Sequence, residues 1–243
     1  MSAGKDRLEL KLDVLDMPGQ RASALMMLSP QELIAATLQE FGEVERLGID
    51  PADYELLELK SGNALDEKPL GELFGKDAKD VHLQLVEKRP ATPRGAQPAT
   101  EAIYLRELGT GRVFRLHWLP AIIGRPDRNL PDNQLLAVNL EALAAGLRVS
   151  RRHVKVIAQS GQYFVQRMSG NPALLRRASG EAVSLLDNSR TPIAAGDVIV
   201  LERSQIALKF LVENNVQRAP AAPQADAHDN RATTAIDENP DQE

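Results

Sequence analysis

The sequence predicts two folded domains of different class, an N-terminal α+β domain and a C-terminal all-β sandwich, followed by a disordered acidic tail. Residues 88–100, KRPATPRGAQPAT, are rich in proline and carry no apolar periodicity, as in an extended linker. Helical periodicity occurs before this stretch, whereas only short strand-like runs follow it. The last thirty or so residues lack aromatic side chains and are too polar to form a core. The expected units are residues 1–88, 89–100, 101–213 and 214–243.

The first domain begins with a predicted β-hairpin and a helix. Apolar and polar residues alternate over 8–14 and again over 24–28, on either side of a turn at Pro18–Gly19. The motif Ser-Pro-Gln-Glu from Ser29 then provides a helix N-cap, a proline at the first helical position and a glutamate three residues after the cap. The helix that follows carries apolar side chains at positions 33, 34, 38 and 41.

The remaining elements complete a β-grasp. Strand-like runs cover 54–60 and 81–85, and a turn at 61–63 and a short strand around 65–70 lie between them. Residues 6–88 resemble ubiquitin in this pattern of strands and helix, which implies a ubiquitin-like domain that binds a second protein. Conjugation is not expected, because the last strand runs into the linker without a free Gly-Gly end. A domain used only for docking or oligomerisation is the plainer reading.

The second domain consists of short strand-like runs separated by turns, without helical periodicity. This spacing predicts an antiparallel sandwich, and its core should be aliphatic because the chain has one Trp, three Tyr and five Phe. The segment 127–147 is long for a loop, and residues 140–145 predict a short helical insert. The predicted strands are 103–108, 113–118, 121–123, 154–157, 163–166, 183–185, 198–201 and 206–212.

Four short motifs lie in order within this domain. Each is weak alone, because a Gly-Arg pair is usually a turn and Ser-Arg-Arg-His is usually a basic loop. The motifs are Ile123-Gly124-Arg125, Val149-Ser150-Arg151-Arg152-His153, Ser169-Gly170-Asn171 and Ala195-Gly196-Asp197-Val198-Ile199. In this order and at these separations they resemble the forkhead-associated (FHA) domain, a phosphothreonine-binding β-sandwich, over about residues 102–213.

The resemblance assigns phosphate binding to Arg125, Ser150 and Arg151. A phosphate dianion needs charged, rigidly held donors, and a guanidinium presents a planar fork that matches two oxygens. A serine hydroxyl adds one further donor. Gly124 is expected to permit the tight turn that presents Arg125. His153 is expected to have a structural role, holding the loop through side-chain hydrogen bonds.

Two further residues are expected to read the peptide around the phosphate. Asn171 matches the asparagine that hydrogen-bonds the ligand main chain in this family. The family continues with Gly-Thr, whereas Pro172-Ala173 follows here, so the loop loses one backbone donor. Arg148 is expected to reach an acidic side chain three residues after the phosphothreonine, or else to be a solvated loop charge. Ser179-Gly180 stands where the family has an Asn-Gly turn, which a glycine turn tolerates.

Charge is distributed unevenly along the chain. Residues 1–100 carry 12 Lys and Arg against 18 Asp and Glu, residues 101–213 carry 15 against 10, and residues 214–243 carry 2 against 6. The basic middle segment is therefore expected to bind the anion. Its arginines lack interleaved aromatic residues and its flanks are acidic, which argues against nucleic acid as the partner.

Other function classes find no support in the sequence. The chain has no cysteine and only four scattered histidines, so neither disulfides nor a metal site are expected. It contains no nucleophile–base motif and no phosphate loop, so we expect no enzyme, no catalytic residue and no cofactor. No run approaches the roughly 18 apolar residues of a membrane span. The first twenty residues lack the apolar block of a signal peptide, which predicts a cytoplasmic protein.

The favoured hypothesis is a signalling adaptor that binds a threonine-phosphorylated protein or peptide. The alternative is a scaffold or oligomerisation protein whose sandwich has lost phosphate binding, for which Pro172 is the reason. Thr233 and Thr234 are candidate phosphorylation sites, because Ile236 and Asp237 follow them at the third position and the FHA family selects both types there. Once phosphorylated, the tail would bind the domain intramolecularly. An unmodified solubilising tail is the plain alternative.

Overall fold

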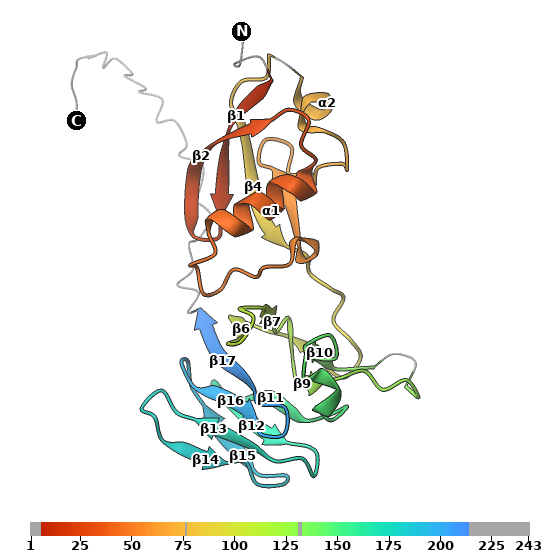
Figure 1. Cartoon of the computed structure of the whole chain (residues 1–243), viewed down its shortest axis with the longest axis vertical. Coiled ribbons are helices and arrows are strands. Elements are labelled where there is room, and N and C mark those ends of the chain that lie inside the picture. Colours follow the sequence, from red (N-terminus) through yellow and green to blue (C-terminus); the bar gives the residue numbers. More distant parts are fainter. Residues whose placement is uncertain (1–5, 76, 131–132, 214–243) are drawn as a thin grey trace, which may run out of the picture.

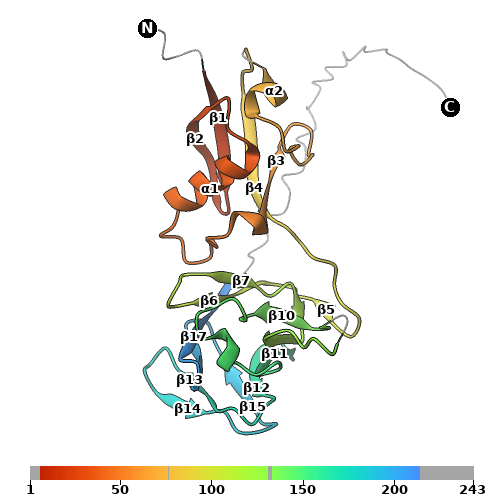
Figure 2. The same ribbon diagram turned by 45° about the vertical axis from the view of Figure 1, so that its right-hand side comes forward.

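The structure is a computed structural model that describes residues 6–75, 77–130 and 133–213. Two folded units are connected by a linker that runs down one side, and β6, β7 and β17 of the second unit lie nearest the first (Figure 1, Figure 2). Within the described ranges, no helix has the length and apolar character that crossing a membrane requires.

The N-terminal domain is a four-stranded mixed sheet with one helix across it. β1 (Arg7–Val14) pairs antiparallel with β2 (Met17–Leu25) and parallel with β4 (Val81–Glu87), and β4 pairs antiparallel with β3 (Tyr54–Glu58). The sheet order is therefore β2-β1-β4-β3. α1 (Pro30–Glu40) lies over one face of this sheet (Figure 1). The hairpin, the helix and the two later strands occur in the predicted order, and the β-grasp and its ubiquitin-like identity stay predictions.

The helix begins where the sequence predicts. The Glu32 amide donates to Ser29 Oγ at 3.3 Å, and the Ser29 amide donates to Glu32 Oε2 at 2.8 Å, so the capping box is complete. Leu33, Ile34 and Leu38 are buried against the sheet, as the apolar spacing predicts.

Two predictions for this domain are wrong in detail. The hairpin turn lies at residues 15–16, where Leu15 has a φ of 52°, and Pro18–Gly19 falls inside β2. The expected short strand around 65–70 is replaced, among the described residues, by an isolated bridge between Leu57 and Ala64 and by α2 (Leu70–Phe74). A 3₁₀ turn, η1 (Pro51–Asp53), precedes β3.

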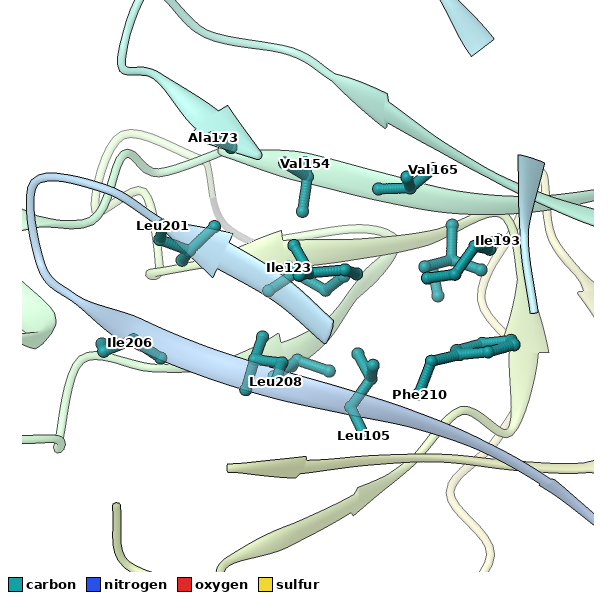
Figure 3. Close-up of a cluster of buried hydrophobic side chains, with 14 of the residues drawn as sticks. Leu105, Ile123, Val154, Val165, Ala173, Ile193, Leu201, Ile206, Leu208 and Phe210 are labelled. Atoms are coloured by element: carbon teal, nitrogen blue, oxygen red, sulfur yellow. The ribbon is translucent and has the colours of Figure 1, made fainter. Parts of the chain in front are cut away.

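The second domain is a sandwich of two sheets, ordered β10-β9-β11-β12-β15 and β14-β13-β16-β17-β6-β7. Aliphatic side chains from both sheets point into the space between them, with Phe210 at one end (Figure 3). The strands are β6 (Ala102–Glu107), β7 (Val113–Arg115), β8 (Trp118–Leu119), β9 (Ala121–Gly124), β10 (Leu136–Asn139), β11 (Val154–Gln159), β12 (Gln162–Arg167), β13 (Ala173–Arg176), β14 (Ala182–Ser184), β15 (Arg190–Ile193), β16 (Val198–Leu201) and β17 (Ile206–Glu213).

Strands β10, β13 and β15 were not predicted from the sequence. One strand was predicted over 113–118, where the chain forms β7 and then β8. The predicted helical insert at 140–145 is wrong, because that segment forms turns and only η2 (Gly146–Arg148) is helical, as one 3₁₀ turn. The end of the predicted linker is also structured. Its residues form β5 (Gln97–Pro98), which pairs with β8.

Candidate functional site

Three loops meet at one edge of the β9–β11–β12 sheet. β11 is antiparallel to both neighbours, and Val154 at its start lies opposite Ile123 near the end of β9 and Arg167 at the end of β12. The chain therefore leaves β9, enters β11 and leaves β12 at the same edge. Each residue predicted to bind the phosphate or the peptide comes from one of these three loops.

Gly124 is required by a close backbone approach rather than by the tight turn that was predicted. A Cβ at Gly124 would lie 2.2 Å from the Arg151 carbonyl oxygen and 2.8 Å from the Ser150 carbonyl oxygen, and Gly124 does not occupy the left-handed region. A side chain here would push the serine–arginine loop away from β9. Gly124 thus sets the distance between Arg125 and Ser150.

Arg125 is held in place by its own side chain. Its Nε donates to the Val149 carbonyl at 2.9 Å, across the gap between the first and second loops. Its terminal guanidinium nitrogens make no hydrogen bond to any residue in the described ranges, and the side chain is only partly exposed. The fork of a partly immobilised guanidinium is therefore free for an oxyanion.

Ser150 and Asn171 are in direct contact. Asn171 Nδ2 donates to Ser150 Oγ at 2.8 Å, so the hydroxyl accepts from the amide and keeps its own proton for another acceptor. Pro172 does not displace Asn171 from this position. Its carbonyl accepts from the Glu202 amide at 3.2 Å, which fastens the third loop to the end of β16.

His153 lies beneath the second loop and is fully buried. Its Nδ1 accepts from the Ser150 amide at 3.4 Å, and its own amide donates to the Ile123 carbonyl at 3.0 Å. Burial lowers the pKa of His153 below its ordinary value, although the backbone of Pro172 and Asn171 partly offsets this effect. A neutral imidazole in this position suits the structural role predicted for His153.

Arg151 is the most exposed of the residues predicted to bind the phosphate. It faces the Asp127 carboxylate, which was not singled out from the sequence. Its Nε lies 3.6 Å from Asp127 Oδ1, and half of its side chain is accessible. The same Asp127 oxygen accepts from the Asn129 amide at 3.0 Å. The Asp-Arg-Asn sequence at 127–129 was the available signal, because aspartate often bonds the amide two residues on.

Arg148 ends η2 and is exposed, two residues before Ser150, as the sequence places it. Its reach toward a peptide stays a prediction. The fourth motif lies elsewhere in the fold, where Asp197 accepts from the Ala194 and Ala178 amides, each at 3.0 Å. Thr233 and Thr234 lie outside the described residues.

Comparisons with known proteins give one kind of match. No family model matches the sequence, and neither does any curated protein. Among solved structures, the FHA domain of human APLF in complex with an XRCC1 bisphospho peptide is 22% identical, with a TM-score of 0.34, over 45% of this chain and 97% of that one. Mycobacterium tuberculosis EmbR, in complex with a low affinity phosphopeptide, is 19% identical, with a TM-score of 0.35, over 46% of this chain and 24% of that one.

A third match comes from a study of phosphothreonine-dependent FHA domain interactions. It is 21% identical, with a TM-score of 0.33, over 46% of this chain and 97% of that one. All three TM-scores are below 0.5, so the likeness by itself supports no statement about function. The geometry of the loop edge has to support the proposed function.

Proposed function

We propose that the C-terminal sandwich is an FHA domain that binds phosphothreonine peptides at the edge formed by Arg125, Ser150, Arg151 and Asn171. The observation that carries the proposal is the state of Arg125, whose Nε is anchored on Val149 while its terminal nitrogens have no partner among the described residues. The Ser150 hydroxyl, with a donor proton to spare, belongs to the loop that this bond fastens.

The arrangement can bind a phosphate without rebuilding its backbone. Arg125 supplies two parallel donors, Ser150 supplies one, and Arg151 adds charge once it leaves Asp127. Asn171 has a carbonyl oxygen and a second amide hydrogen left for the peptide main chain, since only one Nδ2 hydrogen is used by Ser150. Pre-ordered loops reduce the entropy lost on binding.

The test is a calorimetric titration of the full chain with a phosphothreonine peptide and with its unphosphorylated twin. Ser150→Ala should weaken binding of the phosphopeptide by about tenfold to a hundredfold, because a hydrogen bond to a charged group contributes about 1.5 to 3 kcal/mol. Arg176→Ala, which removes an exposed arginine from β13, is the matched control and should bind like the wild type. Equal binding of the two peptides would leave the scaffold alternative.

Arg148 is proposed to read the third position after the phosphothreonine. The side chain is exposed at the end of η2, on the same loop as Ser150, and a guanidinium there can pair with a carboxylate. A peptide array that varies this position should lose its acidic preference in Arg148→Ala. An unchanged preference would make Arg148 a solvated loop charge.

The N-terminal domain is proposed to be the second docking module of a cytoplasmic adaptor. Its exposed apolar side chains include Met27 and Leu25, which line a hollow of about 540 Å³ next to Gly71.

Phosphorylation of Thr233 or Thr234 is proposed to place the tail on the loop edge of the sandwich and to displace peptides of other proteins. Phosphorylating the tail should then weaken outside binding, and Thr233→Ala with Thr234→Ala should abolish the effect.

A further inference from the structure

The outer face of β17, β6 and β7 carries a group of basic side chains outside the phosphate edge. Lys209 of β17 lies opposite Arg106 of β6, and Tyr104 of β6 lies opposite Arg115 of β7. These residues alternate with core residues of the same strands, so they point away from the sandwich core. Such a face needs either water or a partner of opposite charge.

The N-terminal domain supplies that partner. Arg106 donates to the Glu45 carbonyl at 2.9 Å, and Lys209 Nζ lies 2.7 Å from Glu45 Oε1. Further pairs join the same two surfaces, and they are Arg112 with Asp50 at 3.6 Å, Arg115 with Glu87, and Arg46 with Glu213. In four of these five contacts the cation belongs to the sandwich and the acceptor to the N-terminal domain, and Arg46 with Glu213 reverses the order.

Tyr104 indicates how closely the two surfaces meet. It points away from the core, yet only 2% of it is exposed, so something other than its own core covers it. Burial raises the pKa of Tyr104 to about 12, with Glu87 and Glu213 adding to the rise. Glu87 belongs to the N-terminal domain and Glu213 is paired with Arg46 of that domain. Water is therefore excluded from the Tyr104 side chain.

We infer that the N-terminal domain docks on this face in solution and that the two domains move as one rigid body, held by the charge network around Tyr104. Linked domains with polar contacts ordinarily move relative to one another. Here several pairs share one face, and the Glu87 side chain of the Arg115 pair is only 9% exposed, so the network is not a set of isolated surface pairs.

Docking of the two domains accounts for part of the chain's uneven charge distribution. Arg106, Arg112, Arg115 and Lys209 are four of the 15 Lys and Arg of residues 101–213, and all four are used to hold the acidic N-terminal domain. A partner bound to the N-terminal domain would then stand at a fixed position relative to a phosphopeptide on the loop edge. The surface thus fits an acidic protein face, and this chain's own first domain occupies it.

The test is ¹⁵N relaxation on the full chain, which measures how fast each domain tumbles. In the wild type the amides of both domains should give one rotational correlation time. Arg115→Glu places two carboxylates opposite each other and should release the domains, so that each correlation time falls by roughly twofold toward that of a separate domain. Arg115→Glu combined with Glu87→Arg restores the pair in reverse and should return the common value.

Arg176→Glu makes the same charge change on β13 of the same sheet, two strands from Lys209, at a residue with no hydrogen bond or ion pair to the described part of the N-terminal domain, and should leave the common correlation time unchanged. If Arg115→Glu does not fold, Lys209→Glu with and without Glu45→Lys gives the same comparison at the edge of the contact. Independent tumbling in the wild type, or a common value that survives both charge reversals, overturns the inference. Phosphopeptide affinity is measured separately, so either outcome leaves the proposed binding site to its own test.

Discussion

The sandwich uses its arginines in two different ways, and the contrast separates the loop edge from the outer sheet face. On the outer face each of Arg106, Arg112 and Arg115 has an acceptor on the N-terminal domain. At the loop edge Arg125 is anchored by one nitrogen, with its fork open among the described residues. Both regions contribute to the same positive net charge. A binding site for an outside anion is therefore recognised by cations that are positioned yet unpaired, and net charge alone does not find it.

The largest expected effect is at Gly124. The loops at the loop edge can pack together only if this residue has no side chain, and the outer face does not depend on it. Gly124→Ala forces a Cβ to within 2.2 Å of the Arg151 carbonyl, so the loop must move. We expect a loss of about 1 to 3 kcal/mol in the free energy of unfolding and loss of detectable phosphopeptide binding. Gly170→Ala is the matched control for stability, because a Cβ there meets nothing within 4 Å. Denaturant unfolding and calorimetry measure both quantities, and a Gly124→Ala protein that binds normally would show that the loop has room.

The outer face can be probed through His117, which lines the cavity of about 390 Å³ between the two domains. Burial, with smaller contributions from the nearby cations Arg115 and Arg89, lowers the pKa of His117 to about 4. The unfolded chain binds the proton below about 6.5 and the folded chain only near 4, so this residue makes stability fall as pH decreases between those values. One proton sets a limit of about 1.4 kcal/mol per pH unit.

His117→Gln should therefore lose less stability than the wild type between pH 6.5 and 4, as measured by denaturant unfolding at each pH. Carboxylates that titrate in the same window affect both proteins, so the difference between them isolates His117. Parallel pH profiles would mean that the ring is not protected by the contact between the domains.

The smallest expected effect concerns Asp127. It gives Arg151, at the loop edge, an acidic partner of the kind that the arginines of the outer face have. Its carboxylate pairs with Arg151 at 3.6 Å and competes with a phosphate for that cation. Asp127→Asn keeps an oxygen for the Asn129 amide and removes the charge. A pair this exposed contributes about 0.2 to 1 kcal/mol, so phosphopeptide binding should tighten by about 1.4-fold to fivefold. Weaker binding in calorimetry would mean that Asp127 positions Arg151 for the ligand.

Local signals in the sequence were sufficient for some elements and not for others. Ser29 and Glu32 predicted the start of α1 because a capping box is a four-residue pattern. β15 was missed because Arg190–Ile193 contains a proline and only one buried apolar residue. The helix predicted at 140–145 does not form, because the segment folds into turns that end at Gly146. A Cβ at Gly146 would lie 2.0 Å from the Leu140 carbonyl oxygen, so these turns require a glycine there.

The candidate site shows the same division. Resemblance to a family predicted Arg125, Ser150 and Asn171 as binding residues, and the structure brings their loops to one edge of the sheet. No local pattern could find the outer-face contacts, because Lys209 and Glu45 are 164 residues apart and meet only once both domains have folded. Long-range pairs of this kind need the three-dimensional structure.

The most direct test of the contrast is the affinity of the full chain for one phosphothreonine peptide, measured in Arg125→Ala and in Arg106→Ala. Both variants remove one arginine from the same domain, so the change in net charge is identical. If the loop edge binds the phosphate, Arg125→Ala should lose about tenfold to a hundredfold in affinity, and Arg106→Ala should stay near the wild-type value. Equal losses in the two variants would mean that the domain binds phosphate by its general positive charge, and the account of a positioned site would be wrong.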